Sequence, residues 1–280
     1  MQRILRLSLC LFALALASLP VHADEARDGV ADVRHVELGD LRMHVEIHGE
    51  GEPVLLLHGG FGSMEVWRPL IAVLSPHFRV IAPDLRAHGR TNDGDRPFDP
   101  ELLAEDQRAL LDALDVPRAH VVGWSMSGGL ALELALRHPA RVERLVMIAA
   151  LAHHAGLQED FREHLLAATA DTWPAGTVRA WRALAPDPDR WELVFGKLRD
   201  FVASGPRRGA DDYPRVRAPT LVILGEQHTV VKPEHTREQA AAIPHARLLA
   251  CEDAGHGVPL EKPDQVNTAI LRFLTGTDGD

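Results

Sequence analysis

Ser125 follows a short apolar run and precedes a run with helix-like spacing, and small residues stand two positions before and after it, at Gly123 and Ser127. The pattern Gly-x-Ser-x-small at a strand-to-helix junction is typical of a nucleophilic serine held on a tight turn. A helix that starts behind the serine places unpaired amides and the positive end of the helix dipole near its oxygen. The sequence therefore predicts that Ser125 is a nucleophile and that the amide of Met126 stabilises an oxyanion.

Two other interpretations of this segment are weaker. Ser127 is a competing nucleophile, but that choice would place Ser125 at the tight position two residues before it. Nucleotide-binding folds also start helices with glycine and serine, but the segment has neither the dinucleotide spacing nor the phosphate-loop spacing of glycines.

The elements that must position Ser125 are those of an α/β fold. Alternating apolar residues and a turn-prone Gly-Asp pair predict an antiparallel hairpin over 33–39 and 41–48. Nearly continuous apolar runs, which fit strands buried on both faces of a mainly parallel sheet, follow at 53–57, 79–82, 119–122, 144–148 and 220–224. Apolar residues at three- and four-residue spacing predict helices over 64–74, 100–114, 130–137, 234–242 and 263–274. This alternation implies right-handed crossovers and helices on both faces of the sheet.

One long interval does not alternate. Residues 151–217 are helix-prone, rich in tryptophan and phenylalanine, and interrupted by glycine and proline. We therefore predict a helical cap subdomain over 151–217, inserted into a core domain made of residues 24–150 and 218–280.

With these motifs in place, the chain resembles the α/β-hydrolase fold family, in its capped esterase, lactonase and peptidase-like members, over residues 33–275. Residues 55–62, Leu-Leu-Leu-His-Gly-Gly-Phe-Gly, look like the family's His-Gly segment after the third strand. The resemblance implies an eight-stranded, mainly parallel sheet with the cap inserted after the sixth strand. It also implies that the amide of Gly60, or else that of Phe61, is the second oxyanion donor, and that His58 is structural.

The same resemblance singles out His256 among the 16 histidines of the chain. Residues 253–257, Asp-Ala-Gly-His-Gly, resemble the family's loop that presents the catalytic histidine between the last strand and the last helix. A serine hydroxyl is a weak nucleophile at neutral pH, so His256 would accept its proton and return it to the leaving group. Residues 82–91 are similar to a family loop in which Asp84 has a structural role.

The chain departs from the family pattern at the triad acid. Family members place this carboxylate after the seventh strand in a Gly-x-x-Asp turn, and here the turn reads Gly225-Glu226-Gln227-His228. His228 therefore occupies the position of the acid. A histidine cannot supply the negative charge that orients and stabilises the imidazolium.

Three explanations of this departure compete. Glu226 could turn inward and act as the acid. The end of the sixth strand could supply it, but residues 149–152 contain no carboxylate, Asp160 lies in the cap, and Asp253 is too close in sequence to His256. Alternatively, hydrolysis is weakened or absent, since removing the acid of a serine triad costs about 10⁴ in turnover. We expect a slow hydrolase first, a Glu226-assisted hydrolase second and a pure binding protein third.

Neither a metal nor a cofactor is expected. His153, His154, His228 and His256 could converge between cap and core, but their spacing matches no zinc signature.

The expected ligand is a small molecule. Trp124 stands beside the nucleophile and the cap supplies further aromatic residues, which predicts an apolar cleft. The resemblance implies a small, largely uncharged ester, lactone or amide as substrate, and Ser125 in place of aspartate argues against a dehalogenase. The alternative is a ligand-binding or sensing protein with little turnover, which His228 favours and the other motifs oppose.

The first residues predict export. Arg3 and Arg6, the apolar run 7–19 and the small-residue ending at Ala23 are typical of a signal peptide over 1–23 that is cleaved and leaves no membrane anchor, because a spanning helix needs roughly 18–20 apolar residues. We therefore expect a periplasmic or secreted protein. Cleavage removes two arginines and changes the net charge from -10 to -12, which disfavours binding to nucleic acid and anionic membranes. Nothing in the sequence indicates an oligomeric state.

Overall fold

The hairpin and the apolar runs form one eight-stranded sheet in the computed structural model, which describes residues 32–94 and 96–277. The strand order is β1-β2-β4-β3-β5-β6-β7-β8; β1 pairs antiparallel with β2, β2 pairs antiparallel with β4, and the remaining pairs are parallel. The strands are β1 (Asp32–Leu38), β2 (Leu41–His48), β3 (Glu52–Leu57), β4 (Phe78–Pro83), β5 (Ala119–Trp124), β6 (Val142–Ile148), β7 (Thr220–Gly225) and β8 (Arg247–Cys251). The prediction of a mainly parallel eight-stranded sheet is confirmed.

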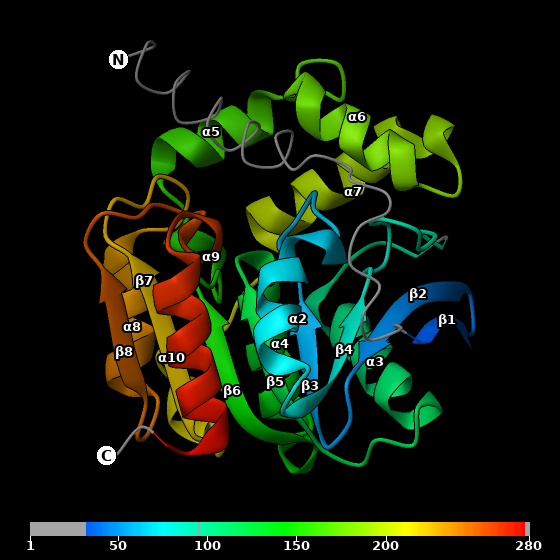
Figure 1. The fold of residues 1–280 in the computed structure, drawn as a ribbon. Helices are drawn as coiled ribbons and strands as arrows, with labels where there is room; N and C mark the ends of the chain where they lie inside the picture. The colour runs from blue at the N-terminus through cyan, green and yellow to red at the C-terminus, as the bar shows by residue number, and fades with distance from the viewer. Residues whose placement is uncertain (1–31, 95, 278–280) are drawn as a thin grey trace.

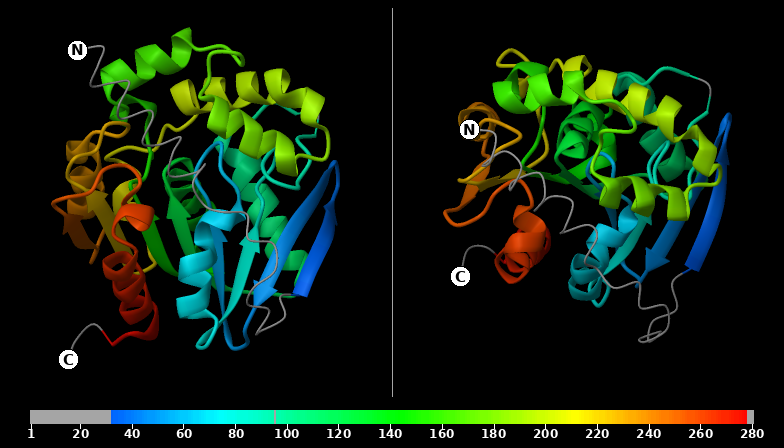
Figure 2. Two further views of the ribbon diagram at one scale, coloured as in Figure 1. Left: turned by 45° about the horizontal axis from the view of Figure 1, so that its top comes forward. Right: turned by 90° about the horizontal axis from the view of Figure 1, so that it is seen from above.

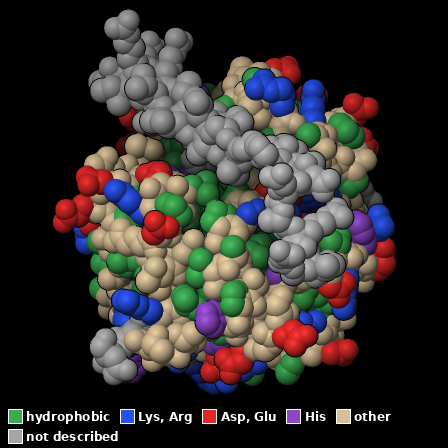
Figure 3. Space-filling model, in the orientation of Figure 1, with side chains coloured by type: hydrophobic (Ala, Val, Ile, Leu, Met, Phe, Trp, Pro, Cys, Tyr) green, Lys and Arg blue, Asp and Glu red, His purple; other side chains and the backbone are tan. Residues whose placement is uncertain are grey.

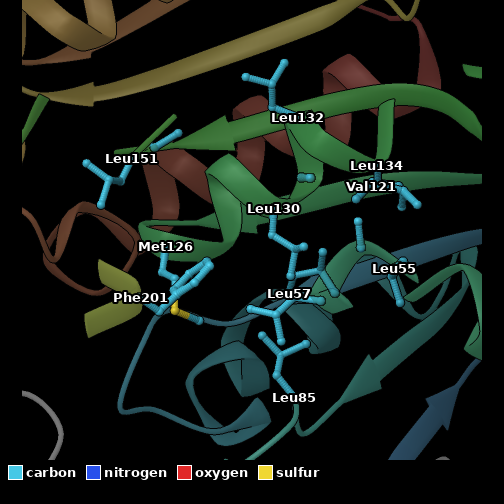
Figure 4. Close-up of a cluster of buried hydrophobic side chains, with 14 of the residues drawn as sticks. Leu55, Leu57, Leu85, Val121, Met126, Leu130, Leu132, Leu134, Leu151 and Phe201 are labelled. Carbon is cyan, nitrogen blue, oxygen red and sulfur yellow. The ribbon is translucent and has the colours of Figure 1, made fainter. Parts of the chain in front are cut away.

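Alternate residues of the central strands face opposite sides of the sheet. In β3, Leu55 and Leu57 belong to one core cluster, whereas Val54 and Leu56 belong to the other. Figure 4 shows Leu55 and Leu57 beside residues of β5 and of a helix on the first face. The first face is covered by α3 (Pro100–Ala113), α4 (Met126–Arg137) and α8 (Pro233–Ala242), and the second by η1 (Met64–Trp67), α2 (Arg68–Leu74) and α10 (Pro263–Thr275) (Figure 1). Helices therefore lie on both faces, as predicted.

Helix α4 begins earlier than the sequence indicates. The apolar spacing predicts a helix over 130–137, and the structure starts it at Met126, directly after Ser125. Glycine lowers helix propensity by roughly 1 kcal/mol relative to alanine, so Gly128 and Gly129 obscured the first turn. That turn is the one that determines the surroundings of Ser125.

The cap lies between β6 and β7, after the sixth strand, as predicted. Its three α-helices are grouped at one end of the sheet, and three short helices accompany them in the sequence (Figures 1 and 2). They are η3 (His154–Gly156), α5 (Glu159–Ala167), α6 (Ala175–Leu184), η4 (Pro188–Arg190), α7 (Trp191–Ser204) and η5 (Tyr213–Arg215). The indole of Trp181 donates to the carbonyl of Ala87 at 2.8 Å, and the buried Asp93 pairs with Arg190 and Lys197. These bonds fix the cap on the core.

Two short helices, η2 (Pro139–Arg141) and α9 (Val258–Glu261), complete the described elements. Within the described ranges no helix is both long and apolar enough to cross a bilayer. The predicted signal peptide, residues 1–23, lies outside those ranges. Figure 3 shows acidic and basic side chains intermixed over the described part of one face.

Candidate active site

Ser125 lies between β5 and α4 in a backbone conformation that side chains rarely adopt, with φ 60° and ψ -122°. A conformation of this kind costs on the order of 1–3 kcal/mol and persists only where its surroundings enforce it. Here its amide donates to Ile148 (2.8 Å), and its carbonyl accepts from Leu151 (3.1 Å). A Cβ at Gly123 would lie 2.1 Å from the carbonyl oxygen of Ser127. The small residues are therefore required by the close approach of strand and helix.

Ser127 and Ser125 have different surroundings. Ser127 is fully buried, and its hydroxyl donates to the carbonyl of His58 at 2.5 Å. The hydroxyl of Ser125 lies 2.8 Å from Nε2 of His256 and borders a pocket. The geometry thus favours Ser125 as the reactive serine, and Ser127 braces the His-Gly segment.

His256 is buried at the loop between β8 and α9, and neighbouring groups hold its backbone. The indole of Trp124 donates to the carbonyl of His256 at 3.0 Å, and the carboxylate of Glu261 accepts from the amide of Gly255 at 2.6 Å. Nε2 of the imidazole faces Ser125, and Nδ1 faces His228. The hydrogen bond from Trp124 to His256 was not predicted, because a tryptophan next to the nucleophile in the sequence could equally well line the pocket.

The group next to Nδ1 of His256 is His228. Its Nε2 lies 2.9 Å from Nδ1 of His256, and the two rings meet edge to face at 4.6 Å. Nδ1 of His228 accepts the amide hydrogens of Val231 (2.9 Å) and Val230 (3.3 Å). Burial lowers the pKa of His228 to about 3, so its ring is neutral at neutral pH.

These bonds determine where the protons lie. A neutral imidazole has one N–H, and the side of His228 that accepts backbone amides cannot carry it. Its proton is therefore on Nε2, which donates to Nδ1 of His256. Burial and His228 also hold the pKa of His256 well below its ordinary value, so this neutral ring carries its own proton on Nε2, toward Ser125.

A serine triad needs the opposite arrangement. There the histidine donates from Nδ1 to the acid, and a bare Nε2 accepts the serine proton. In this structure the hydrogen bonds of the two rings select the tautomer in which Nε2 of His256 donates to Ser125 and cannot accept its proton. His228 thus supplies no negative charge beside His256, and it also determines the tautomer of the His256 ring.

The candidate carboxylates lie elsewhere. Glu226 forms an ion pair with Arg237 of α8 and so points away from the site it was expected to reach. Asp160 and Asp253 are exposed, and residues 149–152 are buried and apolar. The structure therefore brings Ser125 and His256 together, with His228 rather than Glu226 completing the chain of hydrogen bonds.

Gly60 and Met126, whose amides are the predicted oxyanion donors, are neighbouring residues. A Cβ at Gly60 would contact Sδ of Met126 at 3.4 Å, so the His-Gly segment passes over the start of α4. The amide of Phe61 donates to Nε2 of His88 at 3.0 Å and is not directed to the pocket. Of the two alternatives, the geometry thus favours Gly60. The sequence contains no local signal for the contact with His88, because the two residues belong to separate loops.

His58 and Asp84 support this segment. Nε2 of His58 accepts the amide of Leu85 at 3.1 Å, and burial lowers the pKa of His58 to about 4. Asp84 is fully buried and accepts the amides of Met64 (2.8 Å) and Arg90 (2.9 Å). Both side chains act on backbone groups, which is the structural role that the resemblance implies.

A pocket with a cavity volume of about 80 Å³ opens above Ser125 and His256. Its walls come mainly from apolar side chains of core and cap, including Phe61, Leu151 and Trp173. Two further polar side chains, Thr177 and Thr229, line it, and the described lining includes no charged one. Such a site suits a small, uncharged ligand.

The histidines weighed as metal ligands do not form a site. His153 and His154 stack on each other at 4.4 Å, and Nδ1 of His154 bonds the carbonyl of Pro206 at 3.0 Å. Within residues 32–94 and 96–277, no three histidine, cysteine, aspartate or glutamate side chains are grouped so that they could hold a metal ion.

Known proteins resemble both the sequence and the fold. Residues 52–187 match the family model described as alpha/beta hydrolase fold. A relative from Agrobacterium fabrum, named "Putative carbamate hydrolase RutD", is 30% identical over 260 residues, which are 84% of this chain and 99% of the relative. Two solved structures are similar: a hydrolase from Pseudomonas aeruginosa PA01 (TM-score 0.72, 27% identity, 87% of this chain and 98% of that one) and an enol-lactonase from Burkholderia xenovorans LB400 (TM-score 0.71, 26% identity, 86% and 99%).

Proposed function

Because the chain belongs to the α/β hydrolase fold family, we propose that it is a slow serine hydrolase that acts on a small ester, lactone or amide through an acyl-enzyme on Ser125. One observation carries this proposal: the Ser125 hydroxyl, held in a strained elbow, lies 2.8 Å from Nε2 of His256 at the pocket. Nucleophile and base within hydrogen-bond reach are the signature of such chemistry.

Each step assigns a role to a described group. The oxygen of Ser125 attacks the substrate carbonyl carbon, and the amides of Gly60 and Met126 stabilise the oxyanion that forms; losing one such donor typically costs about 3 kcal/mol. His256 accepts the serine proton and transfers it to the leaving alcohol or amine. Water then attacks the acyl-enzyme by the reverse roles, which releases the acid and regenerates Ser125.

The rate is limited by the tautomer of His256. To accept the serine proton, His256 must carry its other proton on Nδ1 and donate it to His228. His228 would then hold its own proton on Nδ1, against the two amides of Val230 and Val231. A wrong tautomer in a serine triad lowers turnover by about 10⁴, and we expect a deficit of that order here.

The proposed substrate class follows from the pocket and from the relatives. The pocket contains no charged lining residue within the described part of the chain, so a charged acyl group would lose hydration without compensation. The names of the relatives, a carbamate hydrolase and an enol-lactonase, both describe cleavage at a carbonyl carbon. A neutral carbonyl substrate with a small acyl part fits both observations.

The test combines fluorophosphonate labelling with turnover of short-chain p-nitrophenyl esters. We expect slow labelling at Ser125, measurable turnover, and loss of both in Ser125→Ala. Ser127→Ala is the matched control, because its hydroxyl bonds a carbonyl and is expected to leave labelling intact. Labelling that survives Ser125→Ala would overturn the proposal.

A second candidate is a ligand-binding or sensing protein that keeps the pocket without turnover. The observation that favours it is the tautomer imposed by His228. A folded wild-type protein that is neither labelled nor active, yet binds neutral esters, would favour this candidate over the first.

We also propose that the protein acts outside the cytoplasm, as residues 1–23 predict. Expression of the full chain in a Gram-negative host, followed by fractionation and intact mass, tests this. A periplasmic product that begins at Asp24 is expected, and an uncleaved cytoplasmic product would contradict it.

A further inference from the structure

The three tryptophans of the cap differ in how their indole N–H groups are used. Trp181 donates to the carbonyl of Ala87 at 2.8 Å, and Trp191 donates to the carbonyl of Ala170 at 3.0 Å. Trp173 has its Nε1 buried with no acceptor among the described residues. A buried donor without a partner is destabilising, and Trp173 is the tryptophan of the three that lines the pocket.

Thr177, four residues further along, is the second unpartnered polar group in this wall. Its side chain lines the pocket and the residue is 2% exposed. No described residue forms a hydrogen bond with its hydroxyl, although threonines elsewhere in the protein, such as Thr275 in α10, bond the carbonyl one turn back. The hydroxyl of Thr177 is thus available to a molecule in the pocket.

The backbone adds donors at the same place. Helix α6 begins at Ala175, and no side chain in the described part of the chain caps its first turn. The first amides of a helix have no partner within the helix, and they make its N-terminus attractive to oxygen acceptors. Pro174 and Thr177 place this turn at the pocket wall. The residues Trp173 and Thr177 and the start of α6 therefore lie in one part of an otherwise apolar wall.

We propose that Trp173 and Thr177 form a polar subsite for a second, uncharged oxygen acceptor of the substrate, such as a keto or ester carbonyl, separate from the carbonyl that Ser125 attacks. The indole N–H and the first amides of α6 can only donate, and the hydroxyl of Thr177 can donate as well, so the groups together select an acceptor oxygen. The pocket's described lining has no lysine or arginine, which disfavours a carboxylate, because burying an unpaired charge is far more costly than burying a carbonyl. This inference rests on the proposed function for the orientation of the substrate, but the subsite itself can be tested without turnover.

The experiment measures binding to the Ser125→Ala variant by calorimetry. The probes are ethyl 4-oxopentanoate, which has the second carbonyl, ethyl pentanoate, which lacks it, and monoethyl succinate, which replaces it with a carboxylate. Thr177→Val removes the hydroxyl at nearly equal volume, and Thr177→Ser is the matched control that keeps it. Trp173→Phe removes the indole N–H and keeps an aromatic ring.

We expect the oxo-ester to bind more tightly than both other probes. Thr177→Val and Trp173→Phe should each weaken its binding by up to about tenfold, the value of one neutral hydrogen bond, and leave ethyl pentanoate within about twofold. Thr177→Ser should retain the preference. Equal losses for both neutral probes would show a packing role only, and preferred binding of monoethyl succinate would show an anion site; either result overturns the proposal.

Failure of the proposed function would be recognised separately. If the wild type shows no labelling and no turnover but the oxo-ester preference is present and depends on Thr177, the subsite stands and the hydrolase assignment falls. If turnover is present and no oxo-ester preference exists in binding or in kcat/KM, the hydrolase stands and the subsite falls.

Discussion

The two ring nitrogens of His256 have neighbours with opposite effects on general-base catalysis. On the Nε2 side, the hydroxyl of Ser125 lies 2.8 Å away, and Ser125 has the strained backbone of an elbow at the start of α4. On the Nδ1 side, Nε2 of His228 lies at a similar hydrogen-bond distance, 2.9 Å, but it belongs to a neutral ring that donates its proton. One half of the site is thus arranged for general-base catalysis, and the other half opposes it.

This difference shows that distance alone does not define a catalytic triad. Each link in the chain of hydrogen bonds has a direction, and the direction is set at its far end by the amides of Val230 and Val231. Those amides would suit a carboxylate equally well, since a carboxylate accepts hydrogen bonds on all sides. A neutral histidine that accepts these amides on Nδ1 must carry its proton on Nε2 and donate it to His256. The His228–His256 and His256–Ser125 hydrogen bonds then both run opposite to those of a serine triad.

The largest expected effect comes from restoring a carboxylate. In His228→Asp one carboxylate oxygen can accept the backbone amides and the other can accept from Nδ1 of His256. We expect kcat/KM for short-chain esters to rise on the order of 10²–10⁴, the reverse of removing a triad acid. Because aspartate is shorter than histidine, His228→Glu is the second variant to be measured.

His228→Asn is the matched control for this gain. Its oxygen accepts the backbone amides and its NH₂ group donates to His256, so the tautomer stays as in the wild type. We expect its kcat/KM to remain within a few-fold of the wild type. A gain in the asparagine variant, or none in either carboxylate variant while the fold is intact, would locate the limitation elsewhere.

The pH profile should separate the same variants. Burial and His228 hold the pKa of His256 well below its ordinary value, so we expect kcat/KM of the wild type to show no acid limb near pH 6.5. A carboxylate beside His256 favours the charged ring and raises its pKa. Activity of His228→Asp should therefore fall about tenfold per pH unit below a limb near pH 6–7. A wild-type limb at pH 6.5 would contradict this account.

The elbow side can be disturbed through packing. A Cβ at Gly128 would lie 2.4 Å from Cβ of Ala150, so Gly128→Ala must separate α4 from the chain after β6. We expect a loss of about 1–3 kcal/mol in the free energy of unfolding in urea. No described atom lies within 4 Å of such a Cβ at Gly196 in α7, and Gly196→Ala should stabilise the protein by roughly 0.5–1 kcal/mol. Equal effects would show that close approach does not shape the elbow.

A further expected effect is on stability in acid. The pKa of His228 is about 3 in the folded protein and ordinary, about 6.5, in the unfolded chain. Between these values the unfolded chain binds a proton that the folded protein does not, so the free energy of unfolding falls by about 1.4 kcal/mol per pH unit below 6.5. His228→Asn lacks this contribution, and its stability should decline less steeply from pH 6 to pH 4 by that amount. Parallel curves would mean that His228 is not buried neutral.

Local patterns allowed much of the site to be predicted. Ser125, Met126 and the His-Gly segment depend on residues adjacent in sequence, because a strand-to-helix turn and its small neighbours are local features. The strands between β3 and β7 could be predicted for the same reason, since each is a short apolar run. The edge strand β8 could not be delimited from the sequence, because several of its residues are partly exposed and it lacks a continuous apolar run of that kind.

The properties that the sequence could not reveal depend on contacts between distant segments. The position of His228 was visible, but the direction of its hydrogen bonds depends on how the chain turns after it. Glu226 pairs with a residue of the following helix, and Phe61 donates to a histidine from another loop. Nothing in the local sequence of either residue records these partners.

The most direct test of the tautomer is nitrogen NMR of the imidazole rings in uniformly ¹⁵N-labelled protein, with His228→Asn and His256→Ala used for assignment. We predict that the wild type carries its protons on Nε2 of both His228 and His256 at pH 7, and that His228→Asp moves the proton of His256 to Nδ1. A wild-type His256 protonated on Nδ1 would contradict the account, because the base would then be ready for Ser125 without any change at His228.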